Sequence, residues 1–522
     1  MFAPAIISTQ GRWFVLEDTS IPIVAVCAVV TLLLLVYRRL SRPLRGPLRH
    51  VPGPLLSKLS ALPLCFYDLT YCRTDQIHQW HRRYGPVVCI APNEISVATL
   101  EATKDVYGTT QRWAKSDYFD HFRGFNVRSV FATKPYREHG AKRRLTSTFY
   151  QATAIYNRPA IEQHVQERAR AVLRQIQPGQ EIDVYSLTDW YAFDIITYLA
   201  LGPDQSTRSV DGVCAERQLL MELKHLQFAG PFRVRYPRLF SYASGLLGRL
   251  IPRLGHLLAD EKLATWCRRR VVKAMKHPHS PGQHSLIGHL LEAPTRQGEK
   301  EAWLDDAYVA AEVLDNVNAA EATVAVTATY LIWRLTEHPW WQERIRSELN
   351  ELPLQTDGSL SFAQVNSQVP SLEACLREVY RLHPASSGRA ERIVPNGGRT
   401  LSGVHLPEGT IVTSSITSLH RDETLFPDPE GFHPERWLDV DEATFRRRDA
   451  QLIPFGHGGR VCLGKALATL EIKLLMARLF LHHEALMTPS TTEASMKQCS
   501  THDAVPRALK CMIRFQVVGG KV

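Results

Sequence analysis

The sequence predicts a mainly α-helical protein with small β-sheets, preceded by a single N-terminal membrane-spanning helix. Three observations support this fold class. Residues 304–338 contain neither glycine nor proline, which is typical of one long helix. Residues 88–99 (VCIAPNEISVAT) place β-branched residues on both sides of a Pro-Asn turn, as in a hairpin. Residues 21–37 are uncharged and mostly apolar, which indicates a membrane segment.

The candidate membrane anchor, residues 21–37, sits at the lower length limit for crossing a hydrocarbon core of roughly 30 Å. Five arginines follow it within residues 38–49, whereas residues 1–20 hold one arginine and two carboxylates. Because positive charge favours the cytosolic side, we expect residues 1–20 in the lumen and the main domain in the cytosol. In a eukaryote this predicts a single-pass protein of the endoplasmic reticulum membrane. A cleaved signal peptide and a buried core helix are the alternatives.

The rest of the chain is expected to form a basic, proline-rich hinge (38–54) and one domain (55–522). Hydrophobic residues make up 44% and charged residues 22%, so a sizeable core is feasible and wholesale disorder is excluded. The net charge of +10 does not indicate nucleic acid, because no basic block is interleaved with stacking aromatics. Membrane lipid or an acidic protein partner fits this charge better. The ten cysteines show no metal-type spacing and are expected to be mostly reduced thiols.

The middle of the long predicted helix is apolar but interrupted by polar residues. Asn316, Asn318, Glu321 and Thr323 all fall within it. Buried polar groups need partners or a wet cavity, so this interruption marks a candidate active site.

A second candidate site is the loop Phe455-Gly-His-Gly-Gly-Arg-Val-Cys-Leu-Gly464, which precedes a helix predicted over residues 465–480. Glycines leave room for a thiolate to approach a flat macrocycle, and a helix N-terminus supplies amide donors that stabilise the sulfur. The alternative is a glycine-rich turn with an incidental buried cysteine.

This loop closely resembles the haem loop of the cytochrome P450 superfamily, and two further motifs occur upstream in the family order. The matching residues are Phe455, Gly458, Arg460, Cys462 and Gly464 in the loop, the Glu-x-x-Arg pair Glu378 and Arg381, and Arg436 in Pro434-Glu-Arg-Trp437. The resemblance covers about residues 45–520. It implies the P450 fold, a haem b (iron-protoporphyrin IX) cofactor, and Cys462 as the axial thiolate ligand of the iron, which favours cleavage of a bound O–O bond.

The resemblance also implies structural and cofactor-binding residues. Glu378, Arg381 and Arg436 correspond to a buried charge triad; an exposed helical ion pair is the alternative. The residues implied to contact haem are His139, Arg143, Arg392, Phe455 and Arg460. Solvated surface charge is the alternative for each of the basic residues, and Lys142 and Arg144 compete with Arg143 as donors.

The segment Ala319-Ala-Glu-Ala-Thr-Val324 is similar to the family's oxygen-activation motif, in which a threonine helps to protonate bound dioxygen. Thr323 matches that threonine, whereas Ala320 replaces the usual glycine and Ala322 replaces the usual acid. Glu321 lies one residue early and is therefore rotated by about 100° on the helix. The alternative for Thr323 is a hydrogen bond to a carbonyl one turn back.

The resemblance implies a monooxygenase that uses dioxygen and NADPH-derived electrons to hydroxylate or otherwise oxidise a small, largely apolar molecule. No nicotinamide or flavin fingerprint is evident, so NADPH-cytochrome P450 reductase is the expected partner and cytochrome b5 a further candidate. The amino-acid sequence of the long helix is similar to that of filamentous-fungal members of the superfamily that tailor secondary metabolites. Because Ala322 replaces the acid, a haem-thiolate isomerase, dehydratase or coupling enzyme remains an alternative, and a non-catalytic haem protein a remote one. Residues 112–125, 221–253 and 386–388 are candidate pocket segments.

Overall fold

The computed structural model describes residues 20–110, 112–276, 284–292, 303–386 and 388–518. The chain divides into two compact units, residues 1–50 and 51–522. The segment expected in the lumen, residues 1–20, lies outside the described residues except for Ser20.

The first unit contains one helix, α1 (Ser20–Arg45), among its described residues. The predicted segment 21–37 is helical, but α1 continues through Pro43 to Arg45, so residues 38–45 are helical and do not form the start of the expected hinge. A proline lacks only its own amide and can be accommodated near a helix end, where few hydrogen bonds remain to be lost. Throughout the part of the chain that the structure describes, no helix is both long and apolar enough to cross a membrane. The predicted membrane-spanning helix is therefore not supported.

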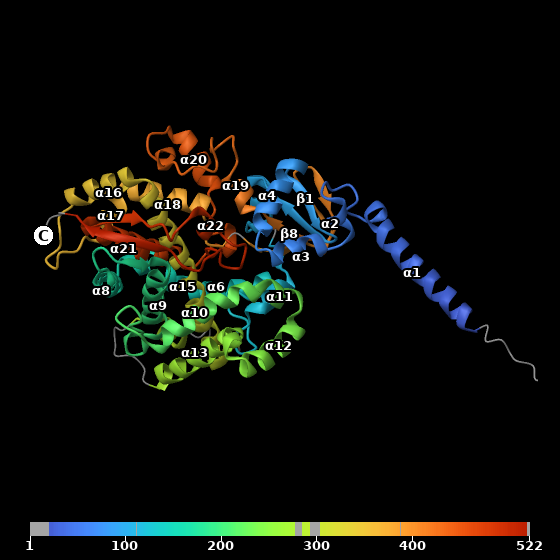
Figure 1. Ribbon diagram of the computed structural model, residues 1–522, viewed down its shortest axis with the longest axis horizontal. Coiled ribbons are helices and arrows are strands. Elements are labelled where there is room, and N and C mark those ends of the chain that lie inside the picture. Colours follow the sequence, from blue (N-terminus) through green and yellow to red (C-terminus); the bar gives the residue numbers. More distant parts are fainter. Residues whose placement is uncertain (1–19, 111, 277–283, 293–302, 387, 519–522) are drawn as a thin grey trace, which may run out of the picture. The chain divides into compact units, whose positions relative to one another are not determined.

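The second unit consists mainly of helices, as predicted (Figure 1). The α-helices are α2 (Leu55–Leu59), α3 (Leu62–Leu69), α4 (Arg73–Tyr84), α5 (Leu100–Tyr107), α6 (Tyr136–Tyr150), α7 (Ala152–Tyr156), α8 (Pro159–Gln175), α9 (Val184–Leu201), α10 (Ala215–Leu226), α11 (Gly230–Arg235), α12 (Pro237–Leu250), α13 (Ala259–Lys276), α14 (Leu286–Leu291), α15 (Asp306–Glu337), α16 (Pro339–Glu351), α17 (Phe362–Gln368), α18 (Pro370–Leu382), α19 (Ile416–His420), α20 (Glu442–Gln451), α21 (Lys465–His482) and α22 (Glu493–Met496). The 3₁₀ helices are η1 (Asp117–Phe122), η2 (Pro203–Gln205), η3 (Gln227–Ala229), η4 (Pro252–Leu258), η5 (Pro434–Trp437) and η6 (Gly458–Arg460).

Three small sheets complete this unit. The strands are β1 (Val87–Ala91), β2 (Glu94–Val97), β3 (Ala114–Lys115), β4 (Glu181–Asp183), β5 (Arg392–Ile393), β6 (Arg399–Leu401), β7 (Val404–Leu406), β8 (Ile411–Ser414), β9 (His483–Met487) and β10 (Met512–Val517). The largest sheet has the order β1-β2-β8-β5-β3, and the others are β4-β10-β9 and β6-β7. The predicted hairpin is confirmed, because β1 and β2 pair antiparallel with Val87 opposite Val97. Strands β5 to β8 lie between residues 392 and 414.

The long helix α15 forms the centre of the core and packs most extensively on α9 (Figure 1). The carboxylate of Asp305 caps its N-terminus by accepting a 2.7 Å hydrogen bond from the amide of Tyr308. The hydroxyls of Thr188 and Thr329 approach within 3.1 Å in the contact between the two helices. The helix ends at Glu337, before Pro339, as the sequence predicts. Its central residues are therefore held rigidly in the interior.

The predicted helix after the cysteine loop is present as α21, and it buries an acid. Glu471 is 1% exposed, and neither carboxyl oxygen has a hydrogen-bond partner among the described residues. Burial raises the pKa of Glu471 well above its usual range, which favours the neutral carboxyl in the folded protein.

Replacing Glu471 with methionine is expected to stabilise the protein, and to do so more at pH 8 than at pH 5. An acid whose pKa is raised by folding contributes most to the free energy of unfolding below its unfolded pKa. That contribution is lost as the pH rises toward the folded pKa. The gain at pH 8 should be on the order of 1–3 kcal/mol, the usual cost of an unsatisfied buried polar group. Thermal unfolding midpoints of both proteins at the two pH values measure it. An equal or larger gain at pH 5 would contradict the neutral state of Glu471.

Candidate functional site

The cysteine loop is closed by its own backbone. The amide of Cys462 donates a 2.9 Å hydrogen bond to the carbonyl of Phe455, so the loop folds back before α21 begins. Gly456 and Gly458 have φ angles of +77° and +71°, which side chains rarely adopt. A Cβ on Gly458 would lie 2.1 Å from the carbonyl oxygen of Tyr107. The glycines thus permit both the turn and the close approach of α5.

The sulfur of Cys462 lies at the N-terminus of α21. It is a free thiol and is exposed, yet enough protein surrounds it for burial to raise the pKa of the thiol. The amides of Gly464 and Lys465 donate hydrogen bonds to the sulfur and, together with Arg143, oppose that rise in pKa. Amide donors and a nearby guanidinium stabilise a thiolate, which is the form that binds metals.

Four predicted basic residues converge near this loop from three elements. They are His139 and Arg143 of α6, Arg392 of β5 and Arg460 of η6. Burial, together with the nearby charges of Arg460, Lys115, Arg143 and Arg392, lowers the pKa of His139 to about 2. Burial and the neighbouring arginines likewise lower the pKa of Arg460 to about 9.

This group of basic side chains has no acidic counterpart. The guanidinium of Arg460 donates 2.8 Å hydrogen bonds to the carbonyls of Thr133 and Lys134 instead of pairing with a carboxylate. Across the described residues, no ion pair involves His139, Arg143, Arg392 or Arg460. Buried cations need anions nearby, so this arrangement is suited to an anionic ligand with more than one carboxylate.

Lys115 adds a fifth basic residue that the sequence analysis missed. It is 4% exposed, and strand pairing places it opposite Arg392. Its ammonium donates to the carbonyl of Phe131 and lies 4.1 Å from the ring centre of Phe119. Burial, with Arg392 and Arg460 nearby, lowers the pKa of Lys115 well below its usual range. No local motif surrounds Lys115, and only the pairing of β3 with β5 reveals its position.

The three residues of the predicted charge triad lie together. Glu378 and Arg381 of α18 are both fully buried, with 2.6 Å between carboxylate and guanidinium. Arg436 of η5 approaches the same carboxylate at 3.3 Å. Glu378 also accepts hydrogen bonds from the indole of Trp437 and the amide of His433, both at 3.0 Å. The carboxylate of Glu378 therefore joins α18 to the segment leading into the loop.

Helix α15 presents Thr323 and Glu321 in different directions. The hydroxyl of Thr323 donates a 2.8 Å hydrogen bond to the carbonyl of Ala319, which is the helical bond considered as the alternative in the sequence analysis. Its oxygen can still accept hydrogen bonds. Glu321 is 5% exposed and its carboxyl contacts Asp189 of α9. Two residues along a regular helix correspond to about 200°, so Glu321 does not share the face of Thr323.

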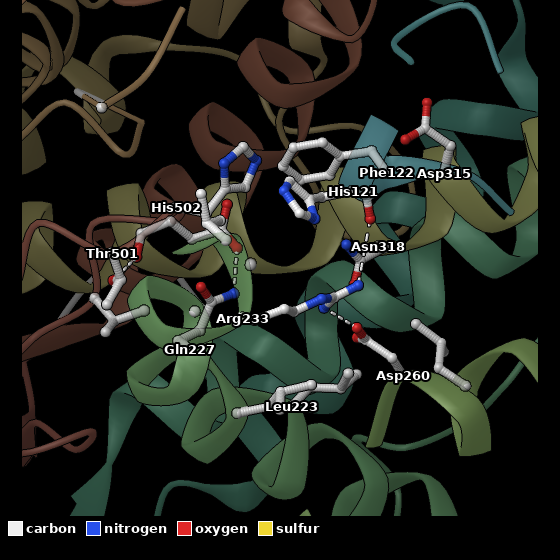
Figure 2. A pocket seen from close by; sticks show the side chains of 18 of the residues that line it. His121, Phe122, Leu223, Gln227, Arg233, Asp260, Asp315, Asn318, Thr501 and His502 are labelled. Carbon is white, nitrogen blue, oxygen red and sulfur yellow. Dashed lines mark hydrogen bonds and ion pairs between the residues drawn. The ribbon is translucent and has the colours of Figure 1, made fainter. Parts of the chain in front are cut away.

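A cavity of about 250 Å³ lies against this part of α15. Its walls include residues from all three predicted pocket segments, within 118–125, 223–234 and at Gly388; residue 387 lies outside the described part. A fourth segment, residues 500–503 with Val505, was not predicted. Figure 2 shows side chains such as His121, Gln227, Asn318 and His502 gathered around the cavity. The structure thus forms a small-molecule pocket beside the oxygen-activation segment.

A thiolate loop, a group of unpaired basic residues and a pocket on a long central helix define a haem-thiolate type of site. The family model for cytochrome P450 matches residues 57–506, and the chain belongs to the cytochrome P450 family. It is a P450 monooxygenase of fungal type.

Fungal P450 enzymes are similar to this chain over most of its length. The cytochrome P450 monooxygenase FGM1 of Gibberella zeae is 36% identical over 90% of this chain and 92% of that protein. The cytochrome P450 monooxygenase tazI of Aspergillus terreus is 27% identical over 93% of this chain and 97% of that protein. Pisatin demethylase of Fusarium vanettenii is 26% identical over 81% of each chain.

The family implies a haem cofactor, and the residues present fit one. An exposed thiol at a helix N-terminus suits an iron ligand, and the buried basic residues without acidic partners suit the two propionates of haem. Cys462 would hold the iron, while Arg143, Arg392, Arg460, His139 and Lys115 would contact or surround the propionates. Phe455 lies at the start of the loop, with its ring 5.1 Å from that of Tyr380.

Proposed function

We propose that this monooxygenase uses electrons from NADPH, delivered by a separate reductase, to oxidise a small molecule in fungal secondary-metabolite biosynthesis. The observation that carries the proposal is the placement of the cavity against α15, because Asn318, Glu321 and Ala322 line the cavity wall and Thr323 follows directly. The fungal relatives support the biosynthetic setting. A surplus of basic residues supports an acidic reductase as partner.

Each part of the site has a separate task in this proposal. Haem bound to Cys462 supplies dioxygen binding and activation at its iron. The basic residues would neutralise and orient the propionates, and Glu378 with its two arginines joins α18 to η5, upstream of the loop that carries Cys462. The cavity holds the substrate away from bulk water. The hydroxyl of Thr323 both carries a proton and accepts one, so it can pass protons toward the reacting centre.

The Thr323→Ala variant is expected to release several-fold more hydrogen peroxide per NADPH consumed, because the hydroxyl that carries protons is removed. The Thr327→Ala variant is a matched control, since its hydroxyl makes the same type of bond, at 3.0 Å to the carbonyl of Thr323. The substrate for this assay is the metabolite that accumulates when the gene is deleted in its producing organism. Equal coupling in Thr323→Ala and the natural protein would remove Thr323 from the mechanism.

A haem-thiolate isomerase, dehydratase or coupling activity is the second candidate function. It is favoured by Ala322, which leaves no acid beside Thr323, and by the orientation of Glu321 toward α9. Glu321 remains a candidate proton donor only if its carboxyl can turn away from Asp189. Product formation from the accumulated metabolite without NADPH or dioxygen would identify this second function and exclude the first.

We also propose that the protein associates with the endoplasmic reticulum membrane and holds its catalytic domain in the cytosol. Helix α1 supports this, because Val26, Leu32 and Leu33 along it are exposed and apolar. Fractionation of the producing cells, with protease protection of intact microsomes, tests the location.

A further inference from the structure

The lining of the cavity has an unequal charge balance. Each basic residue of its wall already has an acidic partner: Arg73 and Arg389 pair with Asp68, Arg123 with Asp120, Lys224 with Asp189, and Arg233 with Asp260. Figure 2 shows the Arg233–Asp260 pair. In contrast, Asp315, Glu321 and Asp503 line the cavity without an ion-pair partner in the described part of the chain. The cavity is therefore short of positive charge.

Two of these three carboxyls lie at the same end of the cavity. Glu321 of α15 is 5% exposed and Asp503 is 4% exposed. Both lie close enough to the hydroxyl of Tyr185 for their charges to raise its pKa. The amide of Gln227 donates a 2.6 Å hydrogen bond to Asp503, which is drawn in Figure 2. The adjacent His502 bonds through Nδ1 to the hydroxyl of Tyr118 at 3.1 Å, and its proximity opposes the rise in the pKa of Asp503.

The one lysine at this end is already engaged. The ammonium of Lys224 lies 2.9 Å from Asp189 and 3.9 Å from the ring centre of Tyr185. Asp189 is 1% exposed and contacts Glu321. Lys224 therefore neutralises Asp189, whereas Glu321 and Asp503 have no ion-pair partner among the described residues. Buried carboxyls of this kind require either protons or a cation from outside.

Burial favours the neutral form of both carboxyls when no cation is near. Burial and the nearby Asp189 raise the pKa of Glu321 well above its usual range, and burial raises the pKa of Asp503. A cation entering the cavity could replace one of these protons without adding net charge to the buried site.

Asp315 differs from this pair. It lies on another part of the wall, where the hydroxyl of Ser129 and the amide of Phe131 donate to its carboxyl. The nearby charge of Lys115 also acts to lower the pKa of the Asp315 carboxyl. Burial nevertheless raises the pKa of Asp315 to about 7, so Asp315 is a comparable buried carboxyl and provides a matched control at a separate position in the same cavity.

We propose that Glu321 and Asp503 recognise a protonated amine of the substrate at this end of the cavity, so that the enzyme prefers cationic amines over neutral molecules of the same shape. The inference rests on the proposed function, because it takes the cavity as the substrate site. It adds cationic amines to the small, largely apolar substrates that the sequence led us to expect. On binding, the amine keeps its proton and one carboxyl releases its proton to solvent.

The test compares two probes of the same shape with the haem-loaded, full-length protein. N,N-dimethyl-2-phenylethylamine is protonated at pH 7.5, and 3-methylbutylbenzene is its neutral carbon isostere. The amine should bind about tenfold more tightly or better, since charge-assisted hydrogen bonds are the strong ones. Titrations followed by the haem absorption spectrum give both dissociation constants. Calorimetry in two buffers of different ionisation enthalpy should show release of a proton with the amine alone.

Substitutions of the three carboxyls test where in the cavity the amine binds. The preference should fall to about twofold or less in Glu321→Gln and in Asp503→Asn, which keep the shape of each side chain but remove the charge. It should persist in Asp315→Asn, which makes the same change elsewhere on the wall. Equal binding of the two probes by the natural protein would overturn the proposal, as would loss of preference only in Asp315→Asn. Neither result affects the monooxygenase assignment, which the carbon monoxide spectrum and NADPH-dependent turnover test separately.

Discussion

The Cys462→Ala variant is expected to lose the carbon monoxide spectrum of a thiolate-ligated haem and all measurable turnover. No other cysteine in the described residues lies at a helix N-terminus facing the basic residues that fit the propionates, so no side chain can replace this ligand. The absorption spectrum of the reduced protein under carbon monoxide measures the effect.

The Cys499→Ala variant is the control, because Cys499 is buried among hydrophobic residues away from the loop. Its spectrum should keep the thiolate signature. A thiolate spectrum that survives in Cys462→Ala would show that another residue binds the iron.

The second large effect is expected from Arg381→Met, which leaves the fully buried carboxylate of Glu378 without its main partner. Removing one member of a buried ion pair typically costs about 3–5 kcal/mol. The three backbone carbonyls that Arg381 contacts, those of His420, Pro429 and Gly431, also lose their donor. We expect little haem-loaded protein and a large fall in the thermal unfolding midpoint.

Arg377→Met on the same helix is the matched control. Arg377 pairs with Glu373 and Asp449, but its side chain is 21% exposed and water can replace the lost contacts. Its cost should stay near 1 kcal/mol or less. If both variants lost equal stability and haem, the triad would have no special structural role.

The parts of the fold that the sequence predicted are those specified locally. The run without glycine or proline from residue 304 predicts α15, and the Pro-Asn turn at residues 92–93 predicts the β1–β2 hairpin. The loop around Cys462 is equally local, since its glycines, its cysteine and the following helix are adjacent in sequence. The prediction at α1 is not supported: no described helix is long and apolar enough to cross a membrane, and the helix continues through Pro43 to Arg45.

The parts of the site that the sequence did not predict depend on distant contacts. Lys115 joins the basic residues only because β3 pairs with β5, whose residues lie far along the chain. The environment of Glu321 depends on Asp189 of α9 and Lys224 of α10, and Asp503 reaches the cavity from the C-terminal segment. Lys115, Asp189, Lys224 and Asp503 belong to no motif that the sequence analysis identified. The sequence therefore predicted the type of chemistry, whereas the charge of the cavity required the three-dimensional structure.

The most direct test of the central claim is the spectrum of the purified full-length protein, reduced and exposed to carbon monoxide. Haem bound through Cys462 predicts the red-shifted Soret band of a thiolate-ligated complex. A band typical of imidazole ligation in freshly prepared protein, or protein that takes up no haem, would contradict the assignment of Cys462 as the iron ligand.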